Sequence, residues 1–171
     1  IFEVGISKPD EMKILENIFS PQIGILTHIG SAHAINFESE EQLIKEKILL
    51  FKDSETIIFN GDNDLVYNLI NEIYSSKKLI SYGFNTRNNL CIKNNLKETL
   101  EPLTFQYFEE KFIIPIYQRD EATLSNAMCI IAVLKELNIG SEDIIKKINS
   151  LKAIEMRLES VNGVRNNLII N

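Results

Sequence analysis

The feature that most constrains the fold is an alternation of short apolar runs with segments of helical period. Four apolar runs have the length of buried strands: 1–6, 23–27, 56–59 and 79–82. Three segments between them repeat apolar residues at three- and four-residue spacing: 12–19, 39–51 and 65–74. Strands that alternate with helices build a parallel sheet covered by helices. The sequence therefore predicts an α/β fold with a parallel, helix-covered sheet.

The middle of the chain has a different pattern, because its strand-like runs follow one another without helices. These runs are 90–96, 103–108 and 112–117. The polar stretch 109–111 predicts a tight hairpin, and Pro115 predicts an edge strand because proline cannot donate to a strand ladder. We therefore expect a small antiparallel sheet appended to the main one. Helical period then returns at 122–137 and again after Ser141, the expected N-cap of a last helix. A further strand is expected at 167–171.

Composition narrows the functional class. The 171 residues are 44% hydrophobic and 25% charged, as in ordinary soluble domains. The formal net charge of -6 comes without a basic patch, which argues against nucleic-acid binding. No apolar run approaches the ~20 residues of a membrane span. Cys91 and Cys129 lie far apart without CxxC spacing, as in a reduced cytoplasmic protein.

Candidate site residues follow from the expected sheet. Ligands of open parallel sheets bind beyond the carboxyl ends of the strands, which selects Ser7, the loop 27–33 and the turn 60–64. The loop 27–33 contains both histidines of the chain, His28 and His33, with a glycine between them. Two histidines in one strand-end loop indicate a site, although a single histidine is more often an ordinary surface or core residue.

Six motifs in this order resemble those of the Mur ligases. They are Glu3 in an E-x-G strand, Thr27 to His33 as T-N-I-G-x-A-H, Lys47 fourteen positions after His33, Asn60 to Asp64 as the N-x-D-D turn, Asn126-Ala127, and 156–159 followed by Gly163 and 166–171. Each motif is weak alone, but six in the right order are specific. The resemblance runs from Glu3 to Asn171.

The resemblance implies an ATP-dependent ligase with magnesium. Such enzymes phosphorylate a carboxylate, and an amine then attacks the acyl phosphate. By this likeness Glu3 would hold one magnesium ion, His33 would help to hold a second, and a carbamylated Lys47 would supply oxygen ligands, so that His33 and Lys47 are also the catalytic candidates. An unmodified lysine ammonium cannot ligate a cation. Without the resemblance, Lys47 is an ordinary solvated helix lysine.

The nucleotide contacts are also carried over from the family. Asn126 would face the adenine, and Arg157 would reach the phosphates or the ribose. The ordinary alternatives are a polar residue near a helix start for Asn126 and an exposed cation for Arg157. Three carboxylates, Glu159, Asp62 and Asp64, are read as solvated surface or turn residues.

Within the family, the E-x-G form and the I-G-x-A-H spelling resemble the ligases that add D-alanyl-D-alanine to UDP-muramoyl-tripeptide. The amino-acid sequence of residues 3–12, together with that of residues 156–159, resembles a subgroup of these ligases that is fused to an alanine racemase domain. Other Mur ligases and folylpolyglutamate synthases share this core and stay open as alternatives. A non-catalytic α/β module is the third alternative.

Three departures from the family pattern stand out. His28 replaces an asparagine, and Ala122-Thr123 replaces His-Asn ahead of Asn126. No glycine is followed by lysine, so the phosphate loop G-x-x-x-x-G-K-[ST] is absent. We therefore expect 1–171 to be the central ATP-binding domain of a longer ligase, without its phosphate loop and its N- and C-terminal domains. Alone, this piece is expected to bind ATP weakly or not at all.

Overall fold

The computed structural model describes residues 1–30, 36–93, 101–116, 119–150, 160–162 and 168–170. The helices are α1 (Glu11–Glu16), α2 (Glu40–Ile48), the 3-10 turn η2 (Leu49–Phe51), α3 (Asp64–Ile73), α4 (Glu121–Glu136) and α5 (Ser141–Asn149). The strands are β1 (Ile23–Leu26), β2 (Thr56–Asn60), β3 (Lys78–Gly83), β4 (Leu90–Ile92), β5 (Leu103–Tyr107), β6 (Glu110–Ile114), β7 (Ser160–Asn162) and β8 (Leu168–Ile170). No helix among the described residues is long and apolar enough to cross a membrane.

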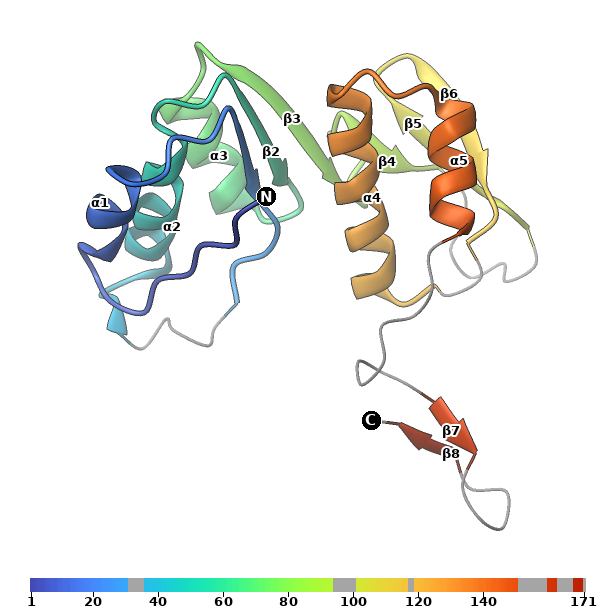
Figure 1. The fold of residues 1–171 in the computed structure, drawn as a ribbon, viewed down its shortest axis with the longest axis horizontal. Helices are drawn as coiled ribbons and strands as arrows, with labels where there is room; N and C mark the ends of the chain where they lie inside the picture. The colour runs from blue at the N-terminus through green and yellow to red at the C-terminus, as the bar shows by residue number, and fades with distance from the viewer. Residues whose placement is uncertain (31–35, 94–100, 117–118, 151–159, 163–167, 171) are drawn as a thin grey trace.

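One six-stranded sheet organises the molecule, in the order β1-β2-β3-β4-β5-β6 (Figure 1). Strands β1 to β4 are parallel, and β4, β5 and β6 are antiparallel. The predicted α/β class is confirmed, and the antiparallel strands extend the parallel sheet across β4. The hairpin between β5 and β6 turns at Phe108 and Glu109, because Tyr107 pairs with Glu110. Strand β8 matches the strand expected near the end of the chain, and it pairs with β7, which was not expected.

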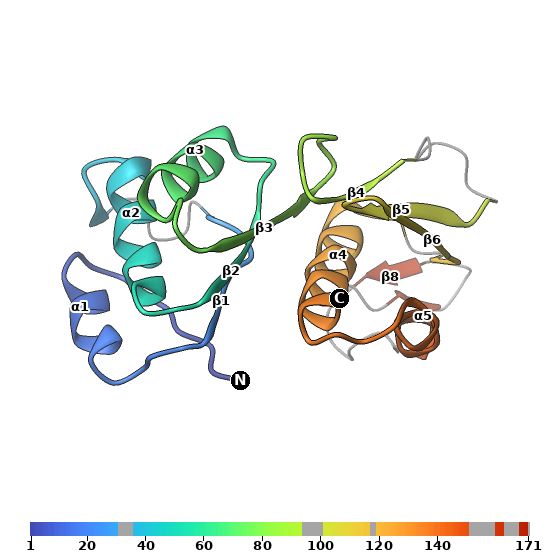
Figure 2. The same cartoon turned by 90° about the horizontal axis from the view of Figure 1, so that it is seen from above.

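Helices cover both faces of the sheet (Figure 2). Successive strand residues point to opposite faces. On β2, Ile57 and Phe59 therefore pack with α2 and α3, whereas Ile58 packs toward α4. Burial on both faces explains why this strand is a continuous apolar run in the sequence.

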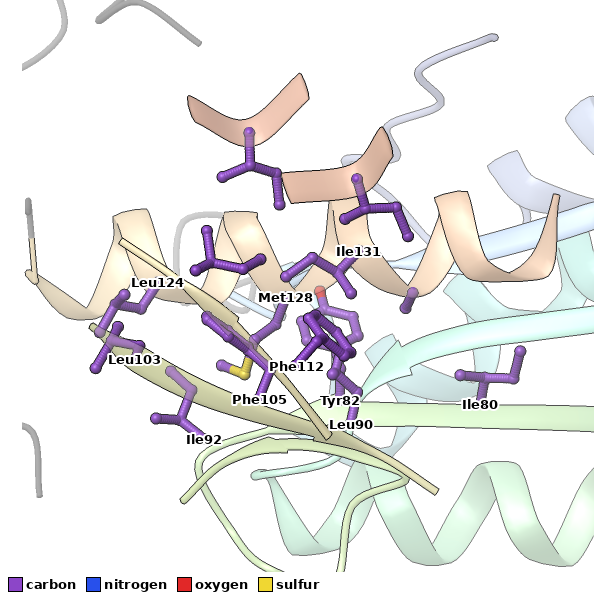
Figure 3. Close-up of a cluster of buried hydrophobic side chains, with 14 of the residues drawn as sticks. Ile80, Tyr82, Leu90, Ile92, Leu103, Phe105, Phe112, Leu124, Met128 and Ile131 are labelled. Atoms are coloured by element: carbon purple, nitrogen blue, oxygen red, sulfur yellow. The ribbon is translucent and has the colours of Figure 1, made fainter. Parts of the chain in front are cut away.

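The larger core lies between α4, α5 and strands β2 to β6. In the close-up, Leu124, Met128 and Ile131 of α4 lie over the sheet (Figure 3). Phe105 and Phe112 stack across the β5–β6 pair with ring centroids 5.9 Å apart. This core anchors α4, whose first two turns border the site described below.

The N-terminal prediction was partly wrong. Residues 1–6 form no strand, and no described strand pairs with them. The Glu11 carboxylate instead accepts hydrogen bonds from the backbone N–H groups of Ser7 (2.6 Å) and Lys8 (3.0 Å), which turns the chain before α1. Helix α1 is also shorter than 12–19. Met12 is buried and Leu15 packs against the same cluster, but Ile14 and Ile18 are exposed, so only part of the predicted apolar face is covered by the described residues.

Several boundaries were also misplaced. Strand β4 ends at Ile92, with 94–96 outside the described residues, and β6 ends at Ile114 because the chain turns there. Pro115 follows this edge strand directly, as its missing N–H predicted. Helix α2 begins close to the start of the predicted segment 39–51. Its N-cap is Ser39, whose hydroxyl accepts from Gln42 N at 3.1 Å.

Ser141 does not cap α5. It is the first helical residue, after Gly140 as N-cap, and its hydroxyl donates to Glu110 of β6. Lys135 of α4 donates to the same carboxylate and to Ser141 Oγ, both at 2.6 Å. The Lys135 side chain is only 9% exposed and lies 5.2 Å from the Phe112 ring centroid. These contacts fasten α4 and α5 to the edge strand.

Glu110→Gln should reduce the free energy of unfolding by up to about 1 kcal/mol at pH 7. The hydrogen bond from Lys135, followed by that from Ser141, lowers the pKa of Glu110 below its ordinary 4.5. The carboxylate therefore stabilises the fold above the unfolded pKa, and this stability is lost as pH falls through the lowered folded pKa. The carboxylate is half-exposed, which limits the effect.

Urea denaturation at pH 7 and pH 3 measures this difference. The loss should be present at pH 7 and small at pH 3. Glu109→Gln, at an exposed turn position beside it, is the matched control and should change neither value. An equal loss at both pH values would contradict the role of the ionised carboxylate.

Candidate functional site

A cavity of about 670 Å³ opens at the carboxyl ends of β1, β2 and β3, beside the first turns of α4. Its walls come from the strand ends and from two helices. The residues that line the cavity are Leu26, Thr27, His28, Ile29, Asn60, Asp62, Asn63, Val66, Phe84, Glu121, Ala122, Ser125 and Asn126. The volume lies within the range of small-molecule sites, roughly 300–1,000 Å³. The structure therefore brings the loop after β1, the turn after β2 and the Asn126 motif of α4 together on one cavity, through His28, Asn60 and Asn126. Ser7, which the strand-end rule also selected, does not line this cavity.

Asn60 joins the end of β2 to α4. Its side-chain nitrogen donates to Ser125 Oγ at 3.2 Å, and its side-chain oxygen accepts from the backbone N–H of Asp62 at 3.0 Å. Asn126 follows Ser125 in the second turn of α4, rather than at the start of the helix as its motif suggested. It is exposed toward the cavity that it lines. The Asn60 contacts thus hold this part of α4 at a set distance from the sheet.

Asp62 is not the solvated carboxylate that the sequence suggested. It is half-buried and accepts from the backbone N–H groups of Phe84 (2.7 Å) and Asn85 (2.8 Å), and from Asn88 Nδ2 (2.9 Å). Three donors account for its position, so it fastens the β3–β4 connection to the end of β2. Asp64 does remain exposed, at 81%, and pairs with Arg87 at 2.6 Å.

The predicted metal ligands are placed only in part. Glu3 is exposed, and Lys47 is half-buried on α2. His33 and Arg157 lie outside the described residues, as does Glu159. Among the residues that are described, no three His, Cys, Asp or Glu side chains group as metal ligands do. A magnesium site here would need His33 and a modified Lys47, so the ligand set stays a prediction.

Described residues near Glu3, His33 and Lys47 in the sequence do meet. Ile6, Phe37 and Leu43 pack in one buried cluster with Met12. They lie within four residues of Glu3, His33 and Lys47, a chain length that reaches roughly 10–14 Å. Leu43 and Lys47 also share a face of α2, because residues four apart in a helix lie one above the other.

Two hydrogen bonds tie these segments together further. Asn36 Nδ2 donates to the backbone oxygen of Ser7 at 2.9 Å, and the backbone N–H of Met12 donates to Glu46 Oε1 at 3.3 Å. Glu46 is the neighbour of Lys47 on α2. The N-terminal segment, residues 36–37 and α2 therefore form one packed unit.

Comparison with known proteins decides the family. The model of the Mur ligase middle domain matches residues 1–134. The chain belongs to this family. A UDP-N-acetylmuramoyl-tripeptide–D-alanyl-D-alanine ligase of Bacillus subtilis is 29% identical over 100% of this chain and 37% of that protein. This Mur ligase domain thus spans little more than a third of that relative.

Solved structures agree with this fold. A crystal structure of MurF from Acinetobacter baumannii superposes with a TM-score of 0.79 at 18% identity, covering 98% of this chain and 37% of that one. MurF ligase from Thermotoga maritima, solved in complex with ADP, gives a TM-score of 0.75 at 20% identity, covering 96% of this chain and 38% of that one. At these identities the likeness establishes the fold of the Mur ligase domain.

Sequence reasoning missed several residues that line the cavity, among them Ser125 and Phe84. Phe84 directly follows β3, so the strand-end rule that selected 27–33 and 60–64 could also have selected it. Ser125 carried no signal of its own, since a serine inside a helix is common. Only the approach of β2 to α4 gives it a role.

Proposed function

We propose that the complete protein is an ATP-dependent ligase that adds D-alanyl-D-alanine to UDP-N-acetylmuramoyl-tripeptide in the cytoplasm. The observation that carries this proposal is similarity over the whole chain to the Bacillus subtilis ligase of that name, together with the six ordered motifs. This domain would supply the nucleotide side of the reaction. The acceptor and the UDP-linked substrate would be bound largely by other parts of the protein.

The strand-end cavity fits the base of ATP. It combines apolar side chains such as Leu26 and Val66 with the carboxamides of Asn60 and Asn126. A carboxamide offers both a donor and an acceptor, which suits the edge of adenine. The carboxylates of Asp62 and Glu121 disfavour phosphate at this end, so the triphosphate would leave the cavity toward the histidine loop.

The magnesium ligands would be Glu3, His33 and carbamylated Lys47. Magnesium supplies neutralisation of phosphate charge while the γ-phosphoryl group passes to the substrate carboxylate. The packing of the Ile6, Phe37 and Leu43 cluster supports this set, because it holds the three carrier segments together. Arg157 would pair with the phosphates or the ribose through its planar guanidinium group.

Asn126→Ala in the complete protein should weaken ATP binding about five- to fiftyfold, because two hydrogen bonds to the base edge are lost. The KM for the acceptor should stay unchanged. Titration calorimetry with ATP measures the Kd. Asn68→Ala, an exposed asparagine on α3 away from the cavity, is the control and should bind ATP like the wild type. Equal ATP affinity in the Asn126 variant would refute the base contact.

An acceptor assay tests the ligase assignment. The complete protein is incubated with ATP, UDP-muramoyl-tripeptide and D-alanyl-D-alanine, and release of phosphate and of the pentapeptide product is followed. Product is expected only with this dipeptide. Turnover only with another amino acid would point to a different Mur ligase, and turnover with a folate substrate to a folylpolyglutamate synthase. Absence of any turnover would favour a non-catalytic module.

We also propose that the complete protein carries an alanine racemase domain. The amino-acid sequence of residues 3–12 supports this fusion, because it resembles that of the racemase-fused subgroup. Conversion of L-alanine to D-alanine by the purified complete protein is the expected result. A protein that forms the pentapeptide but racemises no alanine would leave the ligase assignment standing and remove the fusion.

A further inference from the structure

Phe84 gives the cavity an aromatic wall. It follows the last residue of β3 and is half-buried, partly against the core under α4. Of the described residues that line the cavity, it is the only one with a benzene ring, and His28 has the only other aromatic ring. An aromatic face is suited to a planar base, because stacking tolerates any orientation within the plane.

The backbone of Phe84 is held by Asp62. The carboxylate accepts from Phe84 N at 2.7 Å and from Asn85 N at 2.8 Å. Two adjacent N–H groups on one carboxylate restrict both the position and the direction of the chain at Phe84. Hydrogen bonds to an ionised acceptor are stronger than neutral ones, so this attachment resists displacement.

The approach of Asp62 depends on Gly83. This residue has φ +157°, and a Cβ built on it would lie 2.4 Å from both carboxylate oxygens of Asp62. Any side chain at this position would push the carboxylate away. The absence of a side chain therefore permits the contact that sets Phe84 at the cavity wall.

Arg87 fastens the other end of the same connection. Its Nη2 and Nε donate to the backbone oxygen of Gly61 at 2.7 and 3.2 Å, and its guanidinium lies 4.4 Å from the centroid of the Tyr67 ring. The connection consists only of residues 84–89, shorter than the dozen or so residues of an ordinary parallel crossover. A short loop pinned at both ends gives Phe84 a defined place before any ligand arrives.

We propose that Phe84 stacks on the base of the nucleotide and that Asp62 is a positioning residue acting through it. This inference rests on the proposed ATP site and adds to it a base-binding residue and the device that orients it. Asn60 and Asn126 would read the edge of the base, and Phe84 would contact its face. The alternative is that Phe84 only completes the core under α4.

The test uses the complete protein and ATP, titrated by calorimetry without acceptor. Phe84→Leu keeps an apolar side chain but removes the aromatic face. The Kd for ATP should rise about five- to a hundredfold. Phe84→Tyr keeps the face and should restore affinity to within about threefold of the wild type.

Phe108→Leu is the matched control. Phe108 is an exposed phenylalanine, 47% accessible, in the β5–β6 turn and outside the cavity. This variant should bind ATP like the wild type. Thermal unfolding of each variant checks that the fold is retained. If Phe84→Leu is folded and binds ATP within about twofold of the wild type, the inference is overturned, as it is if Phe84→Tyr binds no better than Phe84→Leu.

A double-mutant cycle isolates the positioning role. Asp62→Asn puts a donor where the carboxylate accepts, so it should raise the Kd for ATP about three- to thirtyfold in the wild type. In the Phe84→Leu background the same change should raise it less than about twofold, because the face that Asp62 orients is already gone. Full additivity would show that Asp62 does not act through Phe84.

These measurements separate the inference from the proposed function. The calorimetric Kd requires no acceptor, so a wrong substrate assignment leaves the Phe84 result interpretable. Product formation by the wild type tests the ligase assignment alone. A wild-type protein that binds no ATP would overturn both.

Discussion

Lys47→Ala should lower kcat of the complete ligase by more than about a hundredfold while the protein stays folded. Under the ligand set proposed above, the variant loses a group that supplies metal ligands, which removes several kcal/mol of charge stabilisation from phosphoryl transfer. Each 1.4 kcal/mol is about tenfold in rate. Lys47 is half-buried on α2, on the same helical face as the buried Leu43. Thermal unfolding of the variant checks that the loss of kcat comes from chemistry rather than from lost stability. Steady-state kinetics at saturating ATP measures it.

Two variants define what Lys47 does. Lys47→Arg keeps the positive charge, but its guanidinium stays protonated and does not form the carbamate, so it should be as inactive as Lys47→Ala. Lys45→Ala is the control on the same helix. Lys45 is exposed and pairs with Glu41 at 2.6 Å, and its loss should change kcat less than about twofold.

The carbamate itself can be tested with carbon dioxide. Wild-type activity should fall in buffer depleted of carbon dioxide and return when bicarbonate is added. An active Lys47→Arg enzyme would refute the carbamate, because it would show that a plain cation suffices at this position.

Gly83→Ala should destabilise the domain by about 2–4 kcal/mol. The new Cβ would lie 2.4 Å from the Asp62 oxygens, at a φ of +157° that side chains rarely adopt. To relieve this clash the Asp62 carboxylate would have to move and break its hydrogen bonds from Phe84 N, Asn85 N and Asn88 Nδ2. For a domain of this size the midpoint of thermal unfolding should fall by roughly 5–15 °C. Because the strain acts through Asp62, ATP affinity should fall as well.

Gly140→Ala is the control for backbone effects of the substitution. A Cβ at Gly140 meets nothing within 4 Å, and its φ of -66° is ordinary. Loss of glycine as the N-cap of α5 should cost less than about 1 kcal/mol. If Gly83→Ala has no larger effect than Gly140→Ala, the β3–β4 connection is more compliant than its hydrogen bonds indicate.

Sequence periodicity predicted the elements whose apolar residues pack directly on the main sheet or lie within it. Strands β2 and β3 are apolar runs because both of their faces are buried, and α4 shows its helical period because one face packs on the sheet. The same reasoning failed at 1–6, where an apolar run lacks a described partner strand. Apolar character predicts burial, and Ile6 is buried, but burial does not require a strand.

The candidate site shows the same division. The strand-end rule selected His28 and Asn60 from the sequence, and a family motif selected Asn126. The structure shows that all three line one cavity. Asp62 was misread, because a carboxylate in a Gly-Asp-Asn turn is usually solvated and its donors come from residues more than twenty positions away. Phe84 was missed because a phenylalanine after a strand resembles any other core residue.

The sequence by itself determined the alternation of strands and helices, the family, and the residue types available for the proposed nucleotide and metal chemistry. These features depend on the local period of apolar residues and on the spacing of motifs along the chain, and both can be read directly from the linear sequence. Only the tertiary structure decided which of them meet. The contact of Asp62 with Phe84, the bond from Asn60 to Ser125, and the cluster of Ile6, Phe37 and Leu43 all join distant segments. Their geometry depends on how the strands and helices pack, which local sequence does not encode.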